Sequence, residues 1–291
     1  MKILHINCNY ILSSLHQCLI EKLNGAGFSN DVFVATYDKN RSIVNIKEYV
    51  KIEECFNKWD RVNFDFKQSK ILKKIEEDYD LRKYDCIHAY TLFTDGNSAM
   101  KLSEKYNIPY VVAVRNTDVN DFFAKRILLR NRGIEIMRKA KKIFFLSDVY
   151  RETVLNNYVP EKYRNEILQK TVVIPNGIDD FWFANEPENE LKVVDKNASV
   201  KLIYAGRIDK NKNIPTTQKA MKLLKNKEIN CELMVIGKVD DKKELKKIIS
   251  DSSTRYEAAR PKEKLIEAYR NADIFVMPSF TESFGLVYAE A

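Results

Sequence analysis

Short apolar runs separated by amphipathic stretches recur along the whole chain. Runs typical of buried strands lie at 2–7, 31–36, 85–89, 110–114, 142–146, 171–174, 201–205, 232–236 and 273–277. Apolar residues at helical spacing predict helices at 13–23, 67–79, 97–106, 216–224, 242–249 and 261–271. This alternation predicts an α/β protein with two doubly wound parallel domains, 1–184 and 200–291. The polar stretch 185–199 is interpreted as the linker, and residues 37–66 give no clear element.

Size and composition agree with this organisation. A chain of 291 residues, 45% hydrophobic and 31% charged, can form two ordinary domains. It has no apolar run near the roughly 20 residues that span a membrane, and its start turns polar too soon for a signal peptide. Five scattered cysteines without a C-x-x-C pair favour reduced thiols, so a cytoplasmic location is expected. The net charge of +8 suits an anionic partner: nucleic acid, anionic lipid or a nucleotide-sugar.

The final stretch carries the strongest pattern. The run at 274–277 predicts a strand, a loop with Glu282 follows, and the residues from Ser283 onward predict a helix. Gly285 would let a ligand approach the backbone closely. In a continuous helix, Glu282 and Glu290 would stand roughly 12 Å apart along the axis, similar to the length of a nucleotide-sugar. Two solvated glutamates explain the spacing equally well.

The surrounding residues favour the functional interpretation. Pro278-Ser-x-x-Glu-Ser-Phe-Gly-Leu-x-x-x-Glu-Ala291 resembles the signature of the retaining family 4 glycosyltransferases, which have the GT-B fold. The resemblance implies two facing Rossmann-like domains, with a nucleotide-sugar donor held mainly by the C-terminal one. Within this stretch it implies that Glu282 is catalytic. The donor contacts that it implies come from Ser283, Phe284, Gly285, Leu286 and Glu290.

A second family pattern follows the predicted strand 201–205. In Gly206-Arg-x-x-x-x-Lys212, two cations lie five residues apart beyond a glycine turn, and fixed cations can stabilise a departing diphosphate. A solvated basic loop is the simpler alternative in a chain with 49 Lys and Arg. The resemblance implies that Gly206, Arg207 and Lys212 hold the donor phosphates and that both cations act in catalysis. Gly237 resembles the glycine turn near the nucleoside, although Val239 stands where a second glycine is usual.

Acceptor-side residues are expected in the first domain, around His88 and in the segment from Arg115 to Asp118. Arg115 departs from the family pattern, in which many relatives have a histidine. Arginine keeps its proton near neutral pH and cannot act as a general base. We therefore expect Arg115 to bind phosphate or acceptor, or to pair with Asp118. Of the other two histidines, His5 and His16 are expected to be structural.

No metal or cofactor is expected. No His, Cys or Asp cluster has the spacing of metal ligands, and no Asp-x-Asp follows a predicted strand. The absence of G-x-G-x-x-G after the first strand disfavours a dinucleotide-dependent oxidoreductase.

The segment 121–142 is strongly basic with interleaved apolar residues. It predicts a core-packed helix with a solvated cationic face, or alternatively a surface that touches anionic lipid.

The resulting hypothesis is a retaining glycosyltransferase. It would move a sugar from a nucleotide-sugar to a glycan or lipid-linked acceptor in cell-surface polysaccharide biosynthesis, with no nucleic-acid partner. Peripheral contact with the inner face of the membrane is compatible with it. The second predicted domain ends after its third clear strand, which suggests a truncated C-terminus. The alternative is therefore a fragment that binds a nucleotide-sugar without turnover.

Overall fold

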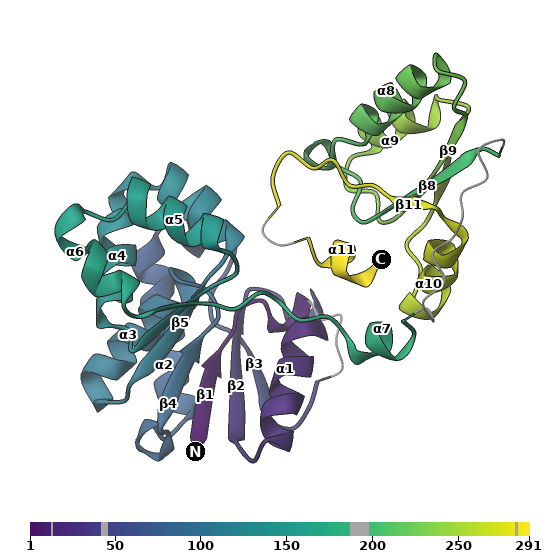
Figure 1. The fold of residues 1–291 in the computed structure, drawn as a ribbon. Coiled ribbons are helices and arrows are strands. Elements are labelled where there is room, and N and C mark those ends of the chain that lie inside the picture. The colour runs from purple at the N-terminus through teal and green to yellow at the C-terminus, as the bar shows by residue number, and fades with distance from the viewer. Residues whose placement is uncertain (13, 42–45, 187–197, 283–284) are drawn as a thin grey trace. The chain divides into compact units, whose positions relative to one another are not determined.

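The computed structural model describes residues 1–12, 14–41, 46–186, 198–282 and 285–291. The chain splits into two compact units, Met1–Asp179 and Asp180–Ala291 (Figure 1). Most of the predicted linker, 185–199, lies outside the described residues, as do Ser283 and Phe284.

The first unit is built on a seven-stranded parallel sheet in the order β3-β2-β1-β4-β5-β6-β7. Its strands are β1 (Lys2–Ile6), β2 (Ser29–Thr36), β3 (Val50–Glu54), β4 (Cys86–Ala89), β5 (Tyr110–Val114), β6 (Lys142–Phe145) and β7 (Thr171–Val173). The chain first builds outward from β1 to β3 and then returns to pair β4 on the other side of β1. The strand order therefore reverses between β1 and β4, which is where open parallel sheets bind ligands.

Helices flank this sheet. They are α1 (Ser14–Gly25), α2 (Phe64–Asp78), α3 (Thr94–Tyr106), α4 (Arg130–Lys139), α5 (Asp148–Asn157) and α6 (Glu161–Leu168). Three short turns precede two of these helices. The turn η3 (Trp59–Arg61) precedes α2, and the π-helical turn η5 (Asp118–Phe123) and the turn η6 (Ile127–Leu129) precede α4. Phe33 packs into the larger core with α2 and α3, whereas its neighbours Val32 and Val34 pack with α1 on the other face. Burial on both faces explains why these strands are continuous apolar runs.

The second unit repeats this design on four parallel strands in the order β10-β9-β8-β11. These are β8 (Val200–Ala205), β9 (Cys231–Ile236), β10 (Thr254–Glu257) and β11 (Ile274–Phe275). Its helices are α7 (Asp180–Ala184), α8 (Ile214–Lys225), α9 (Lys242–Ile249), α10 (Lys262–Asn271) and α11 (Leu286–Glu290). Here the order reverses between β8 and β11.

The structure differs from the sequence prediction at several elements. The helices α5, α6 and α7 were not predicted. The edge strands β3 and β10 were not predicted, because each is short and places charged side chains toward solvent. The predicted strand 273–277 contributes only the two residues of β11, although the N–H of Val276 still donates to the carbonyl oxygen of Ile203 at 2.8 Å. The basic segment 121–142 is not one helix: it divides into the end of η5, the turn η6, α4 and the start of β6. Among the described residues of the final stretch, the helix is Leu286–Glu290, and the predicted helix start at Ser283 lies outside the described residues. Glu282 and Gly285 are not helical, so the helical rise does not set the distance from Glu282 to Glu290.

No helix in the described ranges is long and apolar enough to cross a membrane. The five cysteines are free thiols, each partly buried.

The turn after β9 requires a glycine. A Cβ on Gly237 would lie 1.6 Å from the backbone oxygen of Gly206, which neither backbone can avoid. We expect Gly237→Ala to lower the free energy of unfolding by about 3 kcal/mol, the upper end of overpacking costs. Urea denaturation of this variant is compared with Gly177→Ala, where an added Cβ meets nothing within 4 Å. Equal stability of the two variants would contradict this close approach.

Candidate active site

The loop after β8 begins with strained backbone geometry. Gly206 has φ 147°, a conformation that favours glycine. The hydroxyl of Tyr204 donates a 2.5 Å hydrogen bond to the carbonyl oxygen of Arg207, and this bond holds the turn in place. Asp209 then caps the short turn Lys210–Lys212 by accepting from the backbone N–H of Lys212 at 3.2 Å. The loop that carries both predicted phosphate-binding cations is therefore rigidly built.

Two asparagines attach this loop to the loop after β11. The backbone carbonyl oxygen of Asn211 accepts from the N–H of Phe280 at 2.8 Å, and its side-chain Nδ2 donates to the carbonyl oxygen of Thr281 at 2.9 Å. Asn213 donates through Nδ2 to the carbonyl oxygen of Pro278 at 3.0 Å. These bonds join segments about 70 positions apart in sequence. They hold the two family patterns of the second unit side by side.

Lys212 and Glu282 form an ion pair across this junction, between Nζ and Oε1. The Lys212 side chain is only 12% exposed, so solvent screens its charge less than that of an ordinary surface lysine. The structure thus brings together two of the three residues predicted to be catalytic. Their partnership could not be read from spacing.

Arg207 lies on the same loop with a different environment. Its side chain is exposed, and Nη1 stands 3.5 Å from Oδ2 of Asp240. Exposed pairs at this distance contribute little stability. The guanidinium can therefore change partner at small cost.

The neighbouring turn after β9 packs directly on this loop. Gly237 approaches the Gly206 carbonyl, and Ile208 forms a parallel bridge with Val239. Val239, the residue that departs from the family pattern, thus contributes to the pairing of the two loops. The predicted contact between Gly237 and the donor stays a prediction, since its backbone role is sufficient to require glycine.

The last helix begins at a second special glycine. Gly285 has φ 70°, and a Cβ there would lie 2.7 Å from Cδ2 of Tyr288. Leu286 opens α11, and the hydroxyl of Tyr288 donates to the carbonyl oxygen of Met277 at 2.5 Å. Glu290 ends α11, and its charge adds to burial in raising the pKa of Tyr269. A helix of five residues carries only a small dipole, so the anion-binding argument rests on the loops instead.

The site of the first unit surrounds Tyr90, at the carboxyl ends of β1 and β4. The ring of His88 stacks on Tyr90 at 4.2 Å, and those of His5 and His16 lie 5.8 and 5.1 Å from it. Burial lowers the pKa of His5 and of His16 to about 4 and that of His88 well below its ordinary value. All three imidazoles are therefore neutral at pH 7. Only His88 was predicted to lie at this edge.

Arg115 is tied to this cluster. Its Nε donates to the carbonyl oxygen of Tyr90 at 3.2 Å, and its Nη1 donates to Oδ1 of Asn176 at 3.0 Å. Asn176 belongs to the Pro-Asn-Gly turn after β7. Burial lowers the pKa of Arg115 from its ordinary value. A largely buried guanidinium with two neutral partners is a natural place for an anion to bind.

Asp118 has a structural environment. Its fully buried carboxylate accepts from the backbone N–H groups of Leu92, Phe93 and Arg115 at 2.9–3.2 Å. It therefore ties the loop after β4 to the loop after β5. Its contact with Arg115 is made through the backbone N–H. Burial raises its pKa to about 6.

Asp95 was not among the predicted site residues, although it lies in the acceptor-side stretch that begins at His88. It lies in the first turn of α3, is 1% exposed, and accepts from the N–H of Cys8 at 3.3 Å. Its Oδ2 is buried and has no hydrogen-bond partner among the described residues. Burial raises its pKa to about 7. The sequence feature that could have identified Asp95 is a carboxylate between the predicted strand 85–89 and the predicted helix 97–106.

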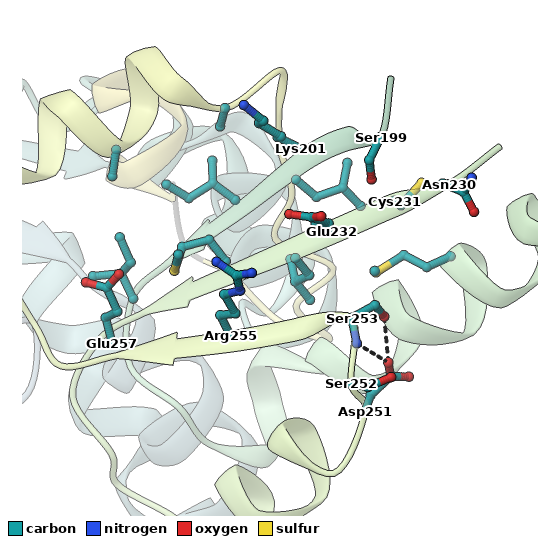
Figure 2. A pocket seen from close by; sticks show the side chains of 18 of the residues that line it. Ser199, Lys201, Asn230, Cys231, Glu232, Asp251, Ser252, Ser253, Arg255 and Glu257 are labelled. Atoms are coloured by element: carbon teal, nitrogen blue, oxygen red, sulfur yellow. Dashed lines mark hydrogen bonds between the residues drawn. The ribbon is translucent and has the colours of Figure 1, made fainter. Parts of the chain in front are cut away.

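A hollow in the described part of the second unit is not lined by these residues (Figure 2). This groove, of about 1030 Å³, runs over β8, β9 and β10 and reaches their amino ends, at Ser199, Asn230 and Ser253. Lys201, Glu232 and Arg255 project along it, and Asp251 accepts two hydrogen bonds from Ser253 at its rim. The groove also reaches the carboxyl ends of β9 and β10, at Ile236 and Glu257, but none of the predicted donor residues lines it, so we assign it no part in the site. Within the described ranges, no three His, Cys, Asp or Glu side chains are grouped as a metal site.

Two parallel α/β units, each with a reversal of strand order in its sheet, are the architecture of the GT-B class of glycosyltransferase. Residues 17–180 match the family described as Glycosyltransferase Family 4, and residues 186–291 match Glycosyl transferases group 1. The first match covers more than half of the chain, so the chain belongs to Glycosyltransferase Family 4. The predicted family and fold class are confirmed.

Two curated relatives are each about a quarter identical to this chain. The D-inositol 3-phosphate glycosyltransferase of Paenarthrobacter aurescens is 26% identical over 229 residues, which are 72% of this chain and 54% of the relative. The alpha-monoglucosyldiacylglycerol synthase of Acholeplasma laidlawii is 26% identical over 228 residues, 72% of this chain and 56% of that protein. The chain thus spans about half the length of the curated relatives it matches.

Solved structures share the fold at low identity. Anabaena HepE in complex with UDP superposes with a TM-score of 0.66 and 15% identity, covering 100% of this chain and 78% of that one. The lipopolysaccharide outer core galactosyltransferase WaaB gives 0.65 and 13%, with the same coverage. The catalytic domain of Arabidopsis thaliana starch synthase IV, bound to ADP and acarbose, gives 0.63 and 13%, with 100% and 80% covered.

The raised pKa of Asp95 has a consequence for stability. Its ordinary value is 3.8 and its folded value about 7, so between these pH values the folded chain binds more protons at this site. Its contribution to the free energy of unfolding therefore falls as the pH rises from about 4 to about 7. We expect Asp95→Asn to gain stability relative to wild type by roughly 1.4 kcal/mol per pH unit in that window.

The measurement is urea denaturation at pH 5, 6, 7 and 8. The buried histidines lose stability as the pH falls from 6.5 toward 4, so the difference between variant and wild type is compared. Asp80→Asn, an exposed aspartate on a nearby turn, is the control. A difference that stays constant with pH would show that Asp95 is ionised normally.

Proposed function

We propose that this chain transfers a sugar, with retention of anomeric configuration, from a nucleotide-diphosphate-sugar to an acceptor. The observation that carries the proposal is the junction at the β8–β11 reversal. There Lys212 pairs with Glu282, and Arg207 lies on the same loop. In solved relatives with this fold, Anabaena HepE was crystallised with UDP-glucose and starch synthase IV with ADP. The base and the sugar are therefore left open.

The chemistry needs cations more than a protein nucleophile. As the bond from the sugar to the diphosphate breaks, negative charge grows on the leaving phosphates, and Arg207 and Lys212 would stabilise it. The acceptor hydroxyl attacks from the face that the diphosphate leaves, and a donor phosphate oxygen takes its proton. Glu282 would hold sugar hydroxyls once Lys212 turns to the phosphates, and Glu290 would hold the ribose.

The acceptor is proposed to bind at the edge of the first unit near Tyr90. His88 and Arg115 lie there, and Arg115 carries the positive charge beside the neutral histidines. The curated relatives are named for an inositol 3-phosphate and for a glucosyldiacylglycerol. We propose a glycan or lipid-linked acceptor, used in cell-surface polysaccharide synthesis. The free cysteines suit a cytoplasmic location.

A binding protein without turnover is the second candidate, because the chain spans about half the length of its curated relatives. The two candidates share the donor site and differ in turnover. A panel of UDP, GDP and ADP in thermal-shift assays identifies the base first, since a ligand at 100 times its Kd stabilises by about 2.7 kcal/mol. Release of the selected diphosphate from its sugar conjugates then separates the candidates.

Removing either cation should weaken binding of the selected diphosphate. We expect Arg207→Ala and Lys212→Ala each to raise its Kd by roughly 10–150-fold, which corresponds to about 1.5–3 kcal/mol for a charge-assisted contact. Lys210→Ala is the matched control, since Lys210 lies on the same turn and is exposed. Calorimetry that finds wild-type affinity in both variants would eliminate the phosphate clamp.

The proposed site neutralises the diphosphate with cations, so binding should not require a metal. We expect the same Kd with a chelator and with added Mn²⁺, measured by calorimetry on the wild-type chain. Restoration of lost binding by Mn²⁺ would overturn this role of Arg207 and Lys212.

A further inference from the structure

Large apolar side chains stand out from one edge of the first unit. Among the described residues, the three most exposed are Leu128 at 98%, Val62 at 87% and Trp59 at 84%. Ile127 and Phe66 beside them are also exposed. We call these five residues the apolar edge. They come from two segments more than 60 positions apart in sequence.

The two segments adjoin in the fold. The rings of Phe64 and Phe122 meet edge to face at 6.2 Å, and Arg132 Nη2 lies 3.6 Å from Asp65 Oδ1. These segments lead into α2 and α4, which both pack against α3 (Figure 1). Each of the two helices precedes a strand, so its amino end lies at the carboxyl edge of the parallel sheet. The apolar edge therefore lies at the same edge as the Tyr90 cluster.

Fixed turns hold these side chains outward. Arg130 donates through Nε to the carbonyl oxygen of Phe123 at 2.7 Å and through Nη2 to that of Ala124 at 3.3 Å, which anchors η6. In η3, the side chain of Asn57 accepts from the N–H groups of Trp59 and Asp60 at 2.9 and 3.0 Å. Exposure of the apolar edge is thus set by local hydrogen bonds.

Cations surround the apolar residues. Segments 58–70 and 121–132 contain eight Lys or Arg, three Asp and no Glu. Arg126 is exposed and stacks on the ring of Phe122 at 4.6 Å. Lys67 is partly buried and lies over the ring of Phe56 at 4.4 Å. Lys125 is exposed, and its ammonium pairs with Asp121, four positions earlier in the chain.

We propose that the apolar edge docks on the surface of an anionic lipid bilayer. Trp59, Val62 and Leu128 would enter the boundary between headgroups and acyl chains, and the cations would contact lipid phosphates. Apolar side chains interleaved with cations fit this surface better than a protein partner, whose interface centre is usually depleted of charge. Docking itself is independent of the proposed transferase. Its use, presenting a lipid-linked acceptor to the Tyr90 cluster, rests on that function.

The test measures sedimentation of the 291-residue chain with vesicles of phosphatidylcholine, with and without about one-third phosphatidylglycerol. We expect binding to the anionic vesicles that weakens with added salt. Trp59→Ser/Leu128→Ser should lower partitioning roughly tenfold or more. Leu223→Ser/Ile249→Ser, which removes exposed apolar residues of α8 and α9, should leave it unchanged.

Charge reversal provides a second pair of variants. Lys125→Glu/Arg126→Glu should reduce partitioning at least fivefold per cation removed, since each contributes about 1 kcal/mol near an anionic leaflet. Lys219→Glu/Lys225→Glu changes the net charge equally in the second unit and should have a much smaller effect. The other tryptophan, Trp182, is buried. A blue shift of tryptophan fluorescence on vesicles therefore reports Trp59.

Loss of binding in both edge variants, with thermal melts like wild type and intact controls, supports the proposal. Absence of wild-type sedimentation, equal binding to neutral vesicles, or edge variants that bind like the controls would each overturn it. Lys212→Ala should bind vesicles as wild type does. Vesicle binding therefore tests the apolar edge independently of the proposed donor site.

Discussion

The reversal of strand order between β8 and β11 determines where the proposed donor site lies. Adjacent parallel strands whose connections leave in opposite directions open a crevice at their carboxyl ends. Asn211 and Asn213 tie the two loops across that crevice through three hydrogen bonds of 2.8–3.0 Å. Because these loops are fixed to each other, Lys212 and Glu282 can meet although 70 positions separate them.

The sheet of the first unit also has a reversal of strand order, but the charged groups beside it are different. At its reversal, between β1 and β4, burial keeps the histidines around Tyr90 neutral and raises the pKa values of Asp95 and Asp118. Arg115 is the cation among these groups. A second-unit loop with two cations suits a diphosphate, whereas neutral imidazoles beside one guanidinium suit an acceptor bearing hydroxyls and a single anionic group.

Hydrophobic patterning predicted most of the central strands, because a parallel strand buried on both faces must be a continuous apolar run. It failed at the edge strands β3 and β10, where Lys51 and Arg255 face solvent and only one face needs apolar residues. Motifs supplied the predicted donor residues but not the residues that these contact. The contact of Gly237 with Gly206 and the position of Asp95 depend on strand pairing between distant segments, which local sequence does not encode.

The proposed membrane surface follows from the same chain geometry as the acceptor-side residues. In a parallel sheet, each helix returns to the amino end of the next strand, so its own amino end lies where the previous strand finished. The turns before α2 and α4 must therefore lie at the edge where Tyr90 and Arg115 lie. Apolar residues exposed on those turns would place a bilayer beside the acceptor-side cluster. A lipid-linked acceptor could then reach Arg115 with its chain still in the membrane.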